Sequence, residues 1–424
     1  MQLRTIALVL LLSVITAFTQ GTQNVYVLNT LGQTLSKVEL ATGVVQKNAV
    51  TAGLYTNQVV IRKQKAYIVN SGTNSIQIVD LSSLTTIDSI YVGTGSNPYY
   101  MDFLNDSIAV VSLLLTNELV VINVDKGSIV TRVILYGTGP EGVKVAGGKV
   151  YVAMSGYNGQ GYDPGIINVV NPVSWSLIDT IGVSINPQYI DVDDSGYVYV
   201  ASTGNYVDVG GALTIIDTQT DEVVQEVLLE TFITTLDYHN GRVFLATYGN
   251  GVYVYDVAGD SLLNTILSGG PGVLVDTDGY IYVTDFNADS LYIYDANLQR
   301  AAAFEVGDGP ISVAVDDPVL TDIQEGETPA IPEKFQLYQN FPNPFNPSTT
   351  IRFELSKAGR VKMEVLNILG QSIITLLDEE LPAGIHALQW NGQAADGRRV
   401  PSGIYFYRLT VNGQQKIRKM HFVQ

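Results

Sequence analysis

The chain has 424 residues, of which 46% are hydrophobic and 15% charged, long enough for a large core beside a smaller domain. Glycine (40) and tyrosine (25) are abundant and cysteine is absent, which favours an all-β protein with many tight turns and excludes disulfides and thiolate metal sites. The net charge is −18, and residues 21–325 hold 33 acidic against 11 basic residues. Without a basic stripe, the sequence argues against binding to nucleic acid or to an anionic membrane.

The first 20 residues have the pattern of a secretory signal peptide. Arg4 supplies a positive start, residues 6–15 are almost wholly apolar, and Ala17 and Thr19 are small residues at a cleavage site near 17–21. The alternative is an uncleaved anchor helix, but the apolar run is short for crossing a bilayer. We therefore expect an exported protein, secreted or at the cell surface, without a transmembrane segment in the mature chain.

One short phrase recurs along residues 21–317: an apolar residue, usually an aromatic, then another apolar residue. Its successive centres are 41, 42, 42, 48, 45 and 38 residues apart, a period that fits a four-stranded propeller blade. Further strands and a Gly-rich turn closing on Pro repeat around each phrase, and Asp-Gly or Asn-Gly pairs supply hairpin turns. The seven centres are Tyr26, Tyr67, Ala109, Tyr151, Tyr199, Phe244 and Tyr282.

The two ends of this region complement each other. The segment 25–29 has no preceding inner strand, whereas residues 310–317 form an inner strand with no following partner. Pairing these segments would close the ring and leave no open edge. We predict a seven-bladed β-propeller over residues 21–317, with an open solenoid or a sandwich as the alternative.

The VYV phrases, the Gly-rich turns ending in Pro and strands such as SIQIVD (75–80) resemble the YVTN-type β-propeller repeats of bacterial surface proteins. They are also similar to the wider lactonase and quinoprotein-like propeller group. The resemblance covers residues 24–317 and implies a fold, but propellers host both enzymes and binding scaffolds.

The composition changes after a short linker at 318–334. Residues 335–424 contain about six alternating strands joined by turns, for example IRFEL (351–355) and IYFYRLTV (404–411). That arrangement predicts an immunoglobulin-like β-sandwich. The complete fold expected is thus all-β, a propeller followed by a sandwich.

The tail also resembles the type A C-terminal sorting domain of the type IX secretion system. The resemblance implies that the secretion machinery is a partner and that the protein crosses the outer membrane, although the chain ends in Gln424 where many such domains end in Lys. A plain Ig-like domain is the alternative. The residues that carry the resemblance are Asn343, Pro344, Phe345, Asn346, Pro347, Gly370, Trp390, Gly403 and Tyr405.

The sequence offers little support for catalysis. Of three histidines only His239 lies in the propeller region, at a predicted hairpin turn, so neither a Ser-His-Asp relay nor a His metal cluster is indicated. The Asp groups at 191–194 and 276–278 precede glycines and are interpreted as hairpin turns. No catalytic residue is predicted.

The candidate ligand site lies in the two longest repeats. The loops 155–165 and 202–211 follow the central strands of neighbouring blades, and from 150 to 240 there are twelve acidic residues and no Lys or Arg. Their aromatic, amide and carboxylate groups suit a sugar or a cation such as Ca²⁺. Decorative insertions are the alternative. The candidate residues are Tyr157, Asn158, Tyr162, Asp163, Asn205, Tyr206 and Asp208.

Three functions are compatible with these features. The first is a non-enzymatic binding or adhesion scaffold for a glycan or surface protein, exported and sorted by its tail. The second is an exported hydrolase or lactonase that uses carboxylates and a metal, for which several acidic side chains would have to converge on the axial pocket. The acids lie mostly at predicted strand ends and turns, which favours the binding scaffold. The third is a structural protein of the surface matrix.

Overall fold

A computed structural model describes residues 23–247 and 249–316 and, except for 339, 341, 342, 344, 356, 368, 369, 383 and 413, residues 335–423. These residues form strands and turns with no helix, which confirms the all-β prediction. No helix among them has the length and apolar character needed to cross a membrane. The predicted signal peptide (1–20) and linker (318–334) lie outside the described residues.

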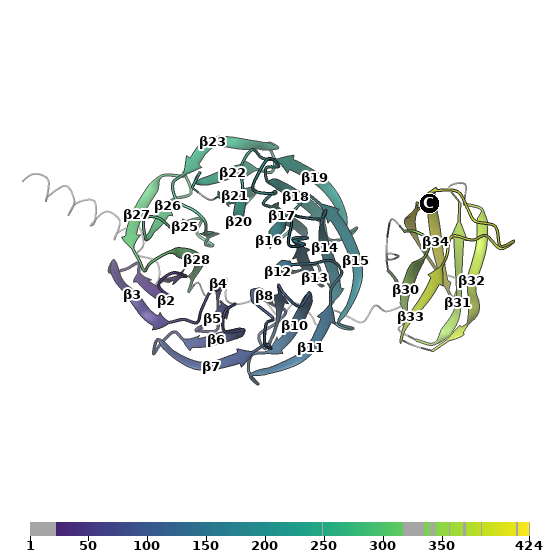
Figure 1. The fold of residues 1–424 in the computed structure, drawn as a ribbon, viewed down its shortest axis with the longest axis horizontal. Coiled ribbons are helices and arrows are strands. Elements are labelled where there is room, and N and C mark those ends of the chain that lie inside the picture. The colour runs from purple at the N-terminus through teal and green to yellow at the C-terminus, as the bar shows by residue number, and fades with distance from the viewer. Residues whose placement is uncertain are drawn as a thin grey trace, which may run out of the picture. The chain divides into compact units, whose positions relative to one another are not determined.

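The strands between residues 23 and 316 form seven four-stranded sheets, arranged around a ring in Figure 1. Six sheets are sequential, β4–β7, β8–β11, β12–β15, β16–β19, β20–β23 and β24–β27, and the seventh has the order β28–β1–β2–β3. The strand bounds are β1 Asn24–Asn29, β2 Thr34–Glu39, β3 Val44–Thr51, β4 Thr56–Arg62, β5 Lys65–Asn70, β6 Ser75–Asp80, β7 Thr85–Tyr91, β8 Pro98–Phe103, β9 Ile108–Leu113, β10 Glu118–Asn123, β11 Ser128–Ile134, β12 Pro140–Ala146, β13 Lys149–Met154, β14 Gly165–Asn171, β15 Ser176–Val183, β16 Pro187–Val192, β17 Tyr197–Ser202, β18 Ala212–Asp217, β19 Glu222–Leu228, β20 Ile233–His239, β21 Arg242–Thr247, β22 Val252–Asp256, β23 Ser261–Leu267, β24 Val273–Val275, β25 Ile281–Asp285, β26 Ser290–Tyr294, β27 Arg300–Glu305 and β28 Pro310–Val315.

The ring closes as predicted. β28 pairs with β1 in antiparallel fashion, with Val25 opposite Val315 and Val27 opposite Val313. The sheet therefore combines the start of the described ring with its end. This pairing confirms the proposed partnership of segments 25–29 and 310–317 and covers the edge of β1.

The recurring phrase forms the second strand of each sheet, which is buried on both faces and is therefore apolar along its middle, with polar residues such as Asn70 at its ends. Three of the central tyrosines donate their hydroxyls to turn carboxylates: Tyr282 to Asp276 (2.7 Å), Tyr151 to Asp221 (2.6 Å) and Tyr199 to Asp193 (3.0 Å). One centre needs correction. Val110, not Ala109, lies opposite the inner strand at the position of the tyrosines, because the hairpin before β9 is longer.

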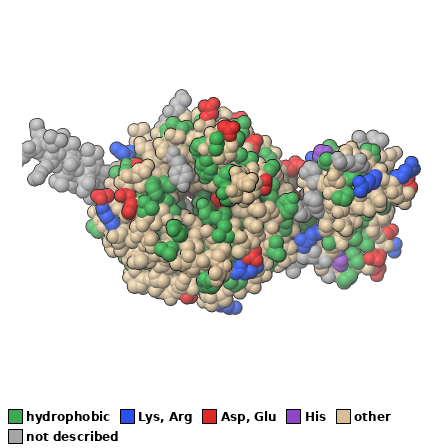
Figure 2. Space-filling view, viewed as in Figure 1, with side chains coloured by type: hydrophobic (Ala, Val, Ile, Leu, Met, Phe, Trp, Pro, Cys, Tyr) green, Lys and Arg blue, Asp and Glu red, His purple; other side chains and the backbone are tan. Residues whose placement is uncertain are grey.

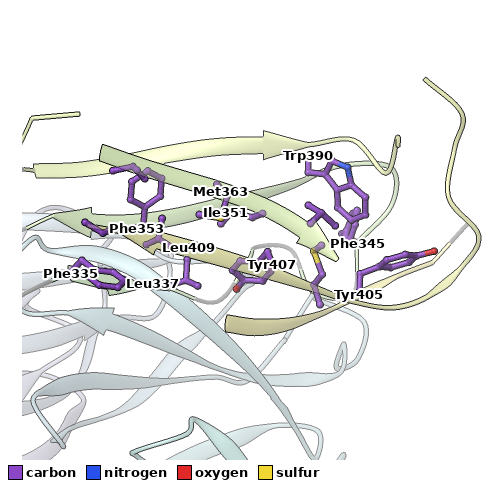
Figure 3. Packing of buried hydrophobic residues seen from close by; sticks show 14 of the residues in the cluster. Phe335, Leu337, Phe345, Ile351, Phe353, Met363, Trp390, Tyr405, Tyr407 and Leu409 are labelled. Atoms are coloured by element: carbon purple, nitrogen blue, oxygen red, sulfur yellow. The ribbon is translucent and has the colours of Figure 1, made fainter. Parts of the chain in front are cut away.

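The tail forms two sheets, β29–β30–β33 and β32–β31–β34–β35, that share one hydrophobic core. Side chains such as Ile351 and Phe353 from β30 meet Met363 from β31 and Leu409 from β34 in that core (Figure 3). This two-sheet arrangement is the Ig-like sandwich that the sequence predicts. The bounds are β29 Phe335–Leu337, β30 Thr349–Leu355, β31 Gly359–Leu366, β32 Ser372–Leu381, β33 Gly384–Trp390, β34 Gly403–Val411 and β35 Gln414–Phe422.

Candidate functional site

The two long loops predicted from the repeat lengths leave the same edge of the ring. In a four-stranded antiparallel sheet, the turn after the second strand and the turn entering the first strand lie at one end. Residues 155–164 join β13 to β14, and residues 203–211 join β17 to β18. We call these two segments the rim loops.

The first rim loop is a small hairpin of its own. Tyr157 and Tyr162 form an isolated antiparallel bridge, and the Asp163 amide donates to the Gly156 carbonyl at 2.9 Å. The Asn158 side chain donates to the Asp163 carboxylate at 3.1 Å and its carbonyl oxygen accepts from the Gln160 amide at 3.1 Å. These bonds hold Tyr157 and Tyr162 side by side without help from a ligand.

Asn205 organises the second rim loop. Its side-chain oxygen accepts hydrogen bonds from the backbone amides of residues 207, 208 and 209, and its amide donates to the Asp208 carboxylate at 2.7 Å. An Asn side chain that satisfies several backbone groups in this way fixes a turn. Tyr206, at φ 61°, therefore projects from a defined turn.

The structure brings the two loops together through their aromatic rings. The ring centroids of Tyr162 and Tyr206 are 6.3 Å apart, Tyr157 lies 5.5 Å from Tyr162, and Phe232 lies 5.5 Å from Tyr206. We call these four side chains the aromatic row. Tyr157 is 54% exposed and Tyr206 43%, so two of its rings face solvent. Phe232, from the turn before β20, is not among the residues predicted from the sequence.

Polar groups from the starts of two inner strands support the aromatic row. Asn186 hydrogen-bonds Tyr162 and donates to the Gly204 carbonyl at 2.9 Å, and Gln188 donates to the Tyr206 hydroxyl at 3.2 Å. Glu141, at the start of β12, is only 6% exposed. Its Oε2 has no hydrogen-bond partner among the described residues, and burial raises its pKa from 4.5 to about 8 despite the Ser155 hydroxyl beside it.

A second candidate site is the axial cavity of about 1100 Å³. Seven of its lining side chains occupy one equivalent position on the seven inner strands, each opposite the central residue of the recurring phrase. Around the ring they are Ala314, Val60, Asp102, Lys144, Asp191, Asp237 and Leu274. At this position the ring is thus charged on four consecutive inner strands and apolar on the other three.

The three aspartates of this position join neighbouring sheets. Asp102 accepts from the backbone amide of Val145 on the next inner strand, at 2.8 Å. Asp191 and Asp237 accept in the same way from Tyr238 and Val275, each at 2.8 Å. The interpretation of Asp191 as a turn residue is therefore wrong, because it lies within β16; Asp276 does cap a turn, accepting from the Tyr280 amide at 2.9 Å.

Lys144 supplies the positive charge of the cavity. Its ammonium lies 2.8 Å from Asp191 Oδ1, and the Asp191 and Asp102 carboxylates raise its pKa against the opposing effect of burial. Burial raises the pKa of Asp102, and burial together with Asp191 raises that of Asp237. The carboxylates therefore do converge on the axial pocket, contrary to the expectation that acids lie at strand ends, but a protein cation already occupies their midst.

Neither region gathers the ligands of a metal ion. Among the described residues no three His, Cys, Asp or Glu side chains come together as a metal group. Asp163 and Asp208 each accept from the Asn of their own loop and lie in separate loops. The rim thus offers one carboxylate per loop, and the Ca²⁺ hypothesis stays a prediction.

The residues that resemble a sorting motif serve the fold of the tail. Phe345 packs 5.6 Å from Trp390, whose ring lies 5.7 Å from Tyr405. The Asn343 side chain accepts from the His421 amide at 2.7 Å, which ties the motif to β35. Asn346 and Pro347 are exposed, Gly370 and Gly403 have open space where a Cβ would lie, and Pro344 lies outside the described residues.

Figure 2 shows hydrophobic side chains near the centre of one face of the ring, with acidic and basic side chains mostly toward its edge.

Comparison with family models matches residues 343–415 to the FlgD Ig-like domain. This match supports the sandwich assignment of the tail. The comparison with curated proteins finds no match.

Among solved structures, the chain is similar to Kuenenia stuttgartiensis hydrazine synthase, with 16% identity and a TM-score of 0.53 over 61% of this chain and 88% of that one. The computationally designed Ika8 protein is 11% identical, with a TM-score of 0.47 over 86% of this chain and 96% of that one. At such identities the first likeness concerns the fold alone, and the second is too slight to support an argument. What the comparisons establish is an all-β chain of repeated sheets that carries a FlgD-type Ig-like domain near its C-terminus.

Proposed function

We propose that the chain is an exported seven-bladed β-propeller that acts as a non-enzymatic binding or adhesion scaffold, and that its binding face is the aromatic row. The propeller would be of the YVTN type. The tail would serve as a type IX sorting domain, which delivers the protein to the cell surface or the medium.

The observation that carries this proposal is the joining of the two rim loops by the Tyr162–Tyr206 contact. Mere insertions would not be expected to bring aromatic rings of two loops into contact, whereas exposed, prearranged aromatic groups on a rigid scaffold are typical of binding sites. The charged side of the axial cavity is, by contrast, satisfied internally by Lys144 and by backbone amides.

A glycan array and a panel of purified surface proteins, probed with the full chain, test the binding role. The double variant Tyr162→Ala with Tyr206→Ala is expected to lose retention at least tenfold. Tyr55→Asn, at a 74% exposed tyrosine in the turn before β4, is the matched control and should bind normally.

A thermal-shift assay with millimolar Ca²⁺, on wild type and Asp163→Asn with Asp208→Asn, tests the cation hypothesis. Equal retention of a ligand by wild type and by Tyr162→Ala with Tyr206→Ala would refute the assignment of the aromatic row as the binding face.

The sorting role rests on the resemblance of the tail, and the Ig-like match fits both this role and a plain Ig-like domain. In a host that has the type IX system, removal of residues 335–424 should leave the propeller in the periplasm. The variant Asn346→Ala changes an exposed side chain of the motif, so it should leave the tail folded while it lowers surface display. Surface display of the truncated chain would contradict the proposal.

The hydrolase alternative is favoured by one observation, the convergence of Asp102, Asp191 and Asp237 on the axial cavity. A metal would have to displace Lys144 from Asp191. A screen of lactone and ester substrates with divalent metals, repeated with Asp191→Asn, tests this alternative. Metal-dependent turnover that Asp191→Asn abolishes would replace the binding role with a catalytic one.

A further inference from the structure

We propose that the aromatic row binds an alkylammonium group, such as a quaternary ammonium or a lysine side chain, with Glu141 as the buried counter-charge. This inference rests on the proposed binding role of the rim and names the chemistry of its ligand. It also adds Glu141, which no sequence pattern indicated, to the site.

The geometry of the rings suits a cation. Successive rings of the row are tilted by 52°, 51° and 47°, so they form walls that face different directions instead of a flat stack. A cation held within about 6 Å of several ring centroids is attracted by each negative ring face. A sugar ring, which stacks one C–H face on one aromatic face, gains less than a cation does from walls that face several directions.

Glu141 supplies the second, independent observation. It is more than nine-tenths buried, and its neighbours Ser155 and Tyr162 both belong to the first rim loop. Its Oε2 has no partner among the described residues. A buried carboxylate in this state costs stability when it ionises, and such a cost is offset when a cation comes to lie nearby.

The positive side chain of Glu141's own strand, Lys144 on β12, is already paired with Asp191 at 2.8 Å. The sequence between residues 150 and 240, which includes both rim loops and Phe232, has twelve acidic residues and no Lys or Arg. The other titratable group facing Glu141 is Tyr162, whose pKa is raised by burial and by the neighbouring Tyr206, so it stays neutral in the range where Glu141 titrates. With Lys144 paired to Asp191, an incoming ammonium would supply Glu141 with a cation that the rim loops themselves lack.

The mechanism predicts a link between binding and protons. In the free protein Glu141 is largely protonated at neutral pH, because burial raises its pKa to about 8. A cation within about 4–6 Å lowers the pKa of a carboxyl by roughly 1–3 units. Binding should therefore release protons near pH 7 and should be at least about tenfold tighter at pH 9 than at pH 6.

Choline and its uncharged carbon analogue 3,3-dimethylbutan-1-ol are the matched probes, used with the full chain in isothermal titration calorimetry. Choline should bind, the alcohol should bind at least tenfold more weakly, and two buffers of different ionisation enthalpy should reveal proton release. Nα-acetyl-lysine amide as a third probe distinguishes a lysine-bearing partner from a quaternary ammonium. Binding of choline and the alcohol with equal affinity would overturn the proposal.

Two variants assign the residues. Glu141→Gln keeps the shape of the side chain and should abolish the pH dependence of choline affinity, while Tyr206→Ala, at an exposed ring, should weaken choline binding at every pH. Tyr55→Asn should change neither. If no ammonium probe binds but the aromatic double variant still loses retention of another ligand, the ammonium inference fails and the binding role stands. If the double variant retains every ligand, the binding role fails as well.

Discussion

Glu141 should make the ring less stable as the pH rises, and Glu141→Gln should remove this effect. The folded-state pKa of about 8 lies above the usual 4.5, so the native state holds its proton over a range where the unfolded chain has lost it. The unfolded state binds fewer protons there, and the free energy of unfolding therefore falls with increasing pH. The stability is highest below about pH 4.5 and the loss is complete near pH 8.

The size of the effect follows from the two pKa values. At about 1.4 kcal/mol per unit, a rise of 3.5 units costs about 5 kcal/mol at high pH, of which about 4 kcal/mol develops between pH 5 and pH 9. The side chain is almost fully buried, so solvent screening takes little from this order of magnitude. Gln carries no charge, and any constant cost of burying its amide is the same at both pH values.

The decisive quantity is thus the difference in unfolding free energy between wild type and Glu141→Gln at pH 5 and at pH 9. Urea titration with hydrogen exchange and mass spectrometry, read on peptides from β12 and β13, separates unfolding of the ring from that of the Ig-like domain. Asp102 and Asp237 also make stability fall with pH, but they are present in both proteins, so their effects cancel. A difference that stays constant within about 1 kcal/mol from pH 5 to pH 9 would refute the reasoning.

Three further predictions concern other parts of the chain. Lys144→Met should cost about 1–3 kcal/mol at pH 7, since the ammonium is partly exposed, and less at pH 4, where Asp102 and Asp237, whose pKa values burial raises, take up protons; thermal unfolding at the two pH values checks this. Removing residues 308–424 should expose the edge of β1 and lower the melting temperature of the ring well below that seen on removing 326–424, whereas equal melting would count against closure by β28. Trp390→Ala should cost the Ig-like domain about 3–5 kcal/mol, because its indole is 1% exposed, and hydrogen exchange should increase in β30 and β33 but not in the ring.

The repeat could be read from the sequence because it is built from local patterns. A strand buried on both faces is apolar at most of its positions, and a two-residue hairpin must have residues that tolerate positive φ. Tyr26, Tyr151 and Tyr282 therefore reappear at a regular period. The shift from Ala109 to Val110 has the same physical origin: a longer hairpin changes the count of residues without changing the strand that follows.

Loop length alone predicted the position of the two rim loops, but it did not predict how their aromatic rings come together. Lengths show that loops 155–165 and 202–211 project from neighbouring sheets, whereas the Tyr162–Tyr206 contact depends on how Asn158 and Asn205 turn their loops. Phe232 could not be predicted as a site residue because it lies in a turn of ordinary length. Glu141 follows the turn proline of its repeat, and nothing in the sequence distinguishes it from an exposed acid. Its burial depends on the tertiary structure, in which Ser155 of the first rim loop contacts its carboxyl group.

The axial aspartates show why acids in strands need to be judged across repeats and not within one. Within β16 the sequence PQYIDV gives Asp191 no distinction from the turn acids that follow it. Aligned by register, however, Asp102, Asp191 and Asp237 share one position, and a charged residue in the middle of an inner strand is costly unless the next sheet satisfies it. Each does receive a backbone amide from the next inner strand, and Lys144, which has the same position between them, neutralises part of the charge. Glu141 meets the same requirement, a partner for every buried charge, only in part, because its Oε2 has no partner among the described residues. A cationic ligand near Glu141 would offset the cost of ionising this buried carboxyl group.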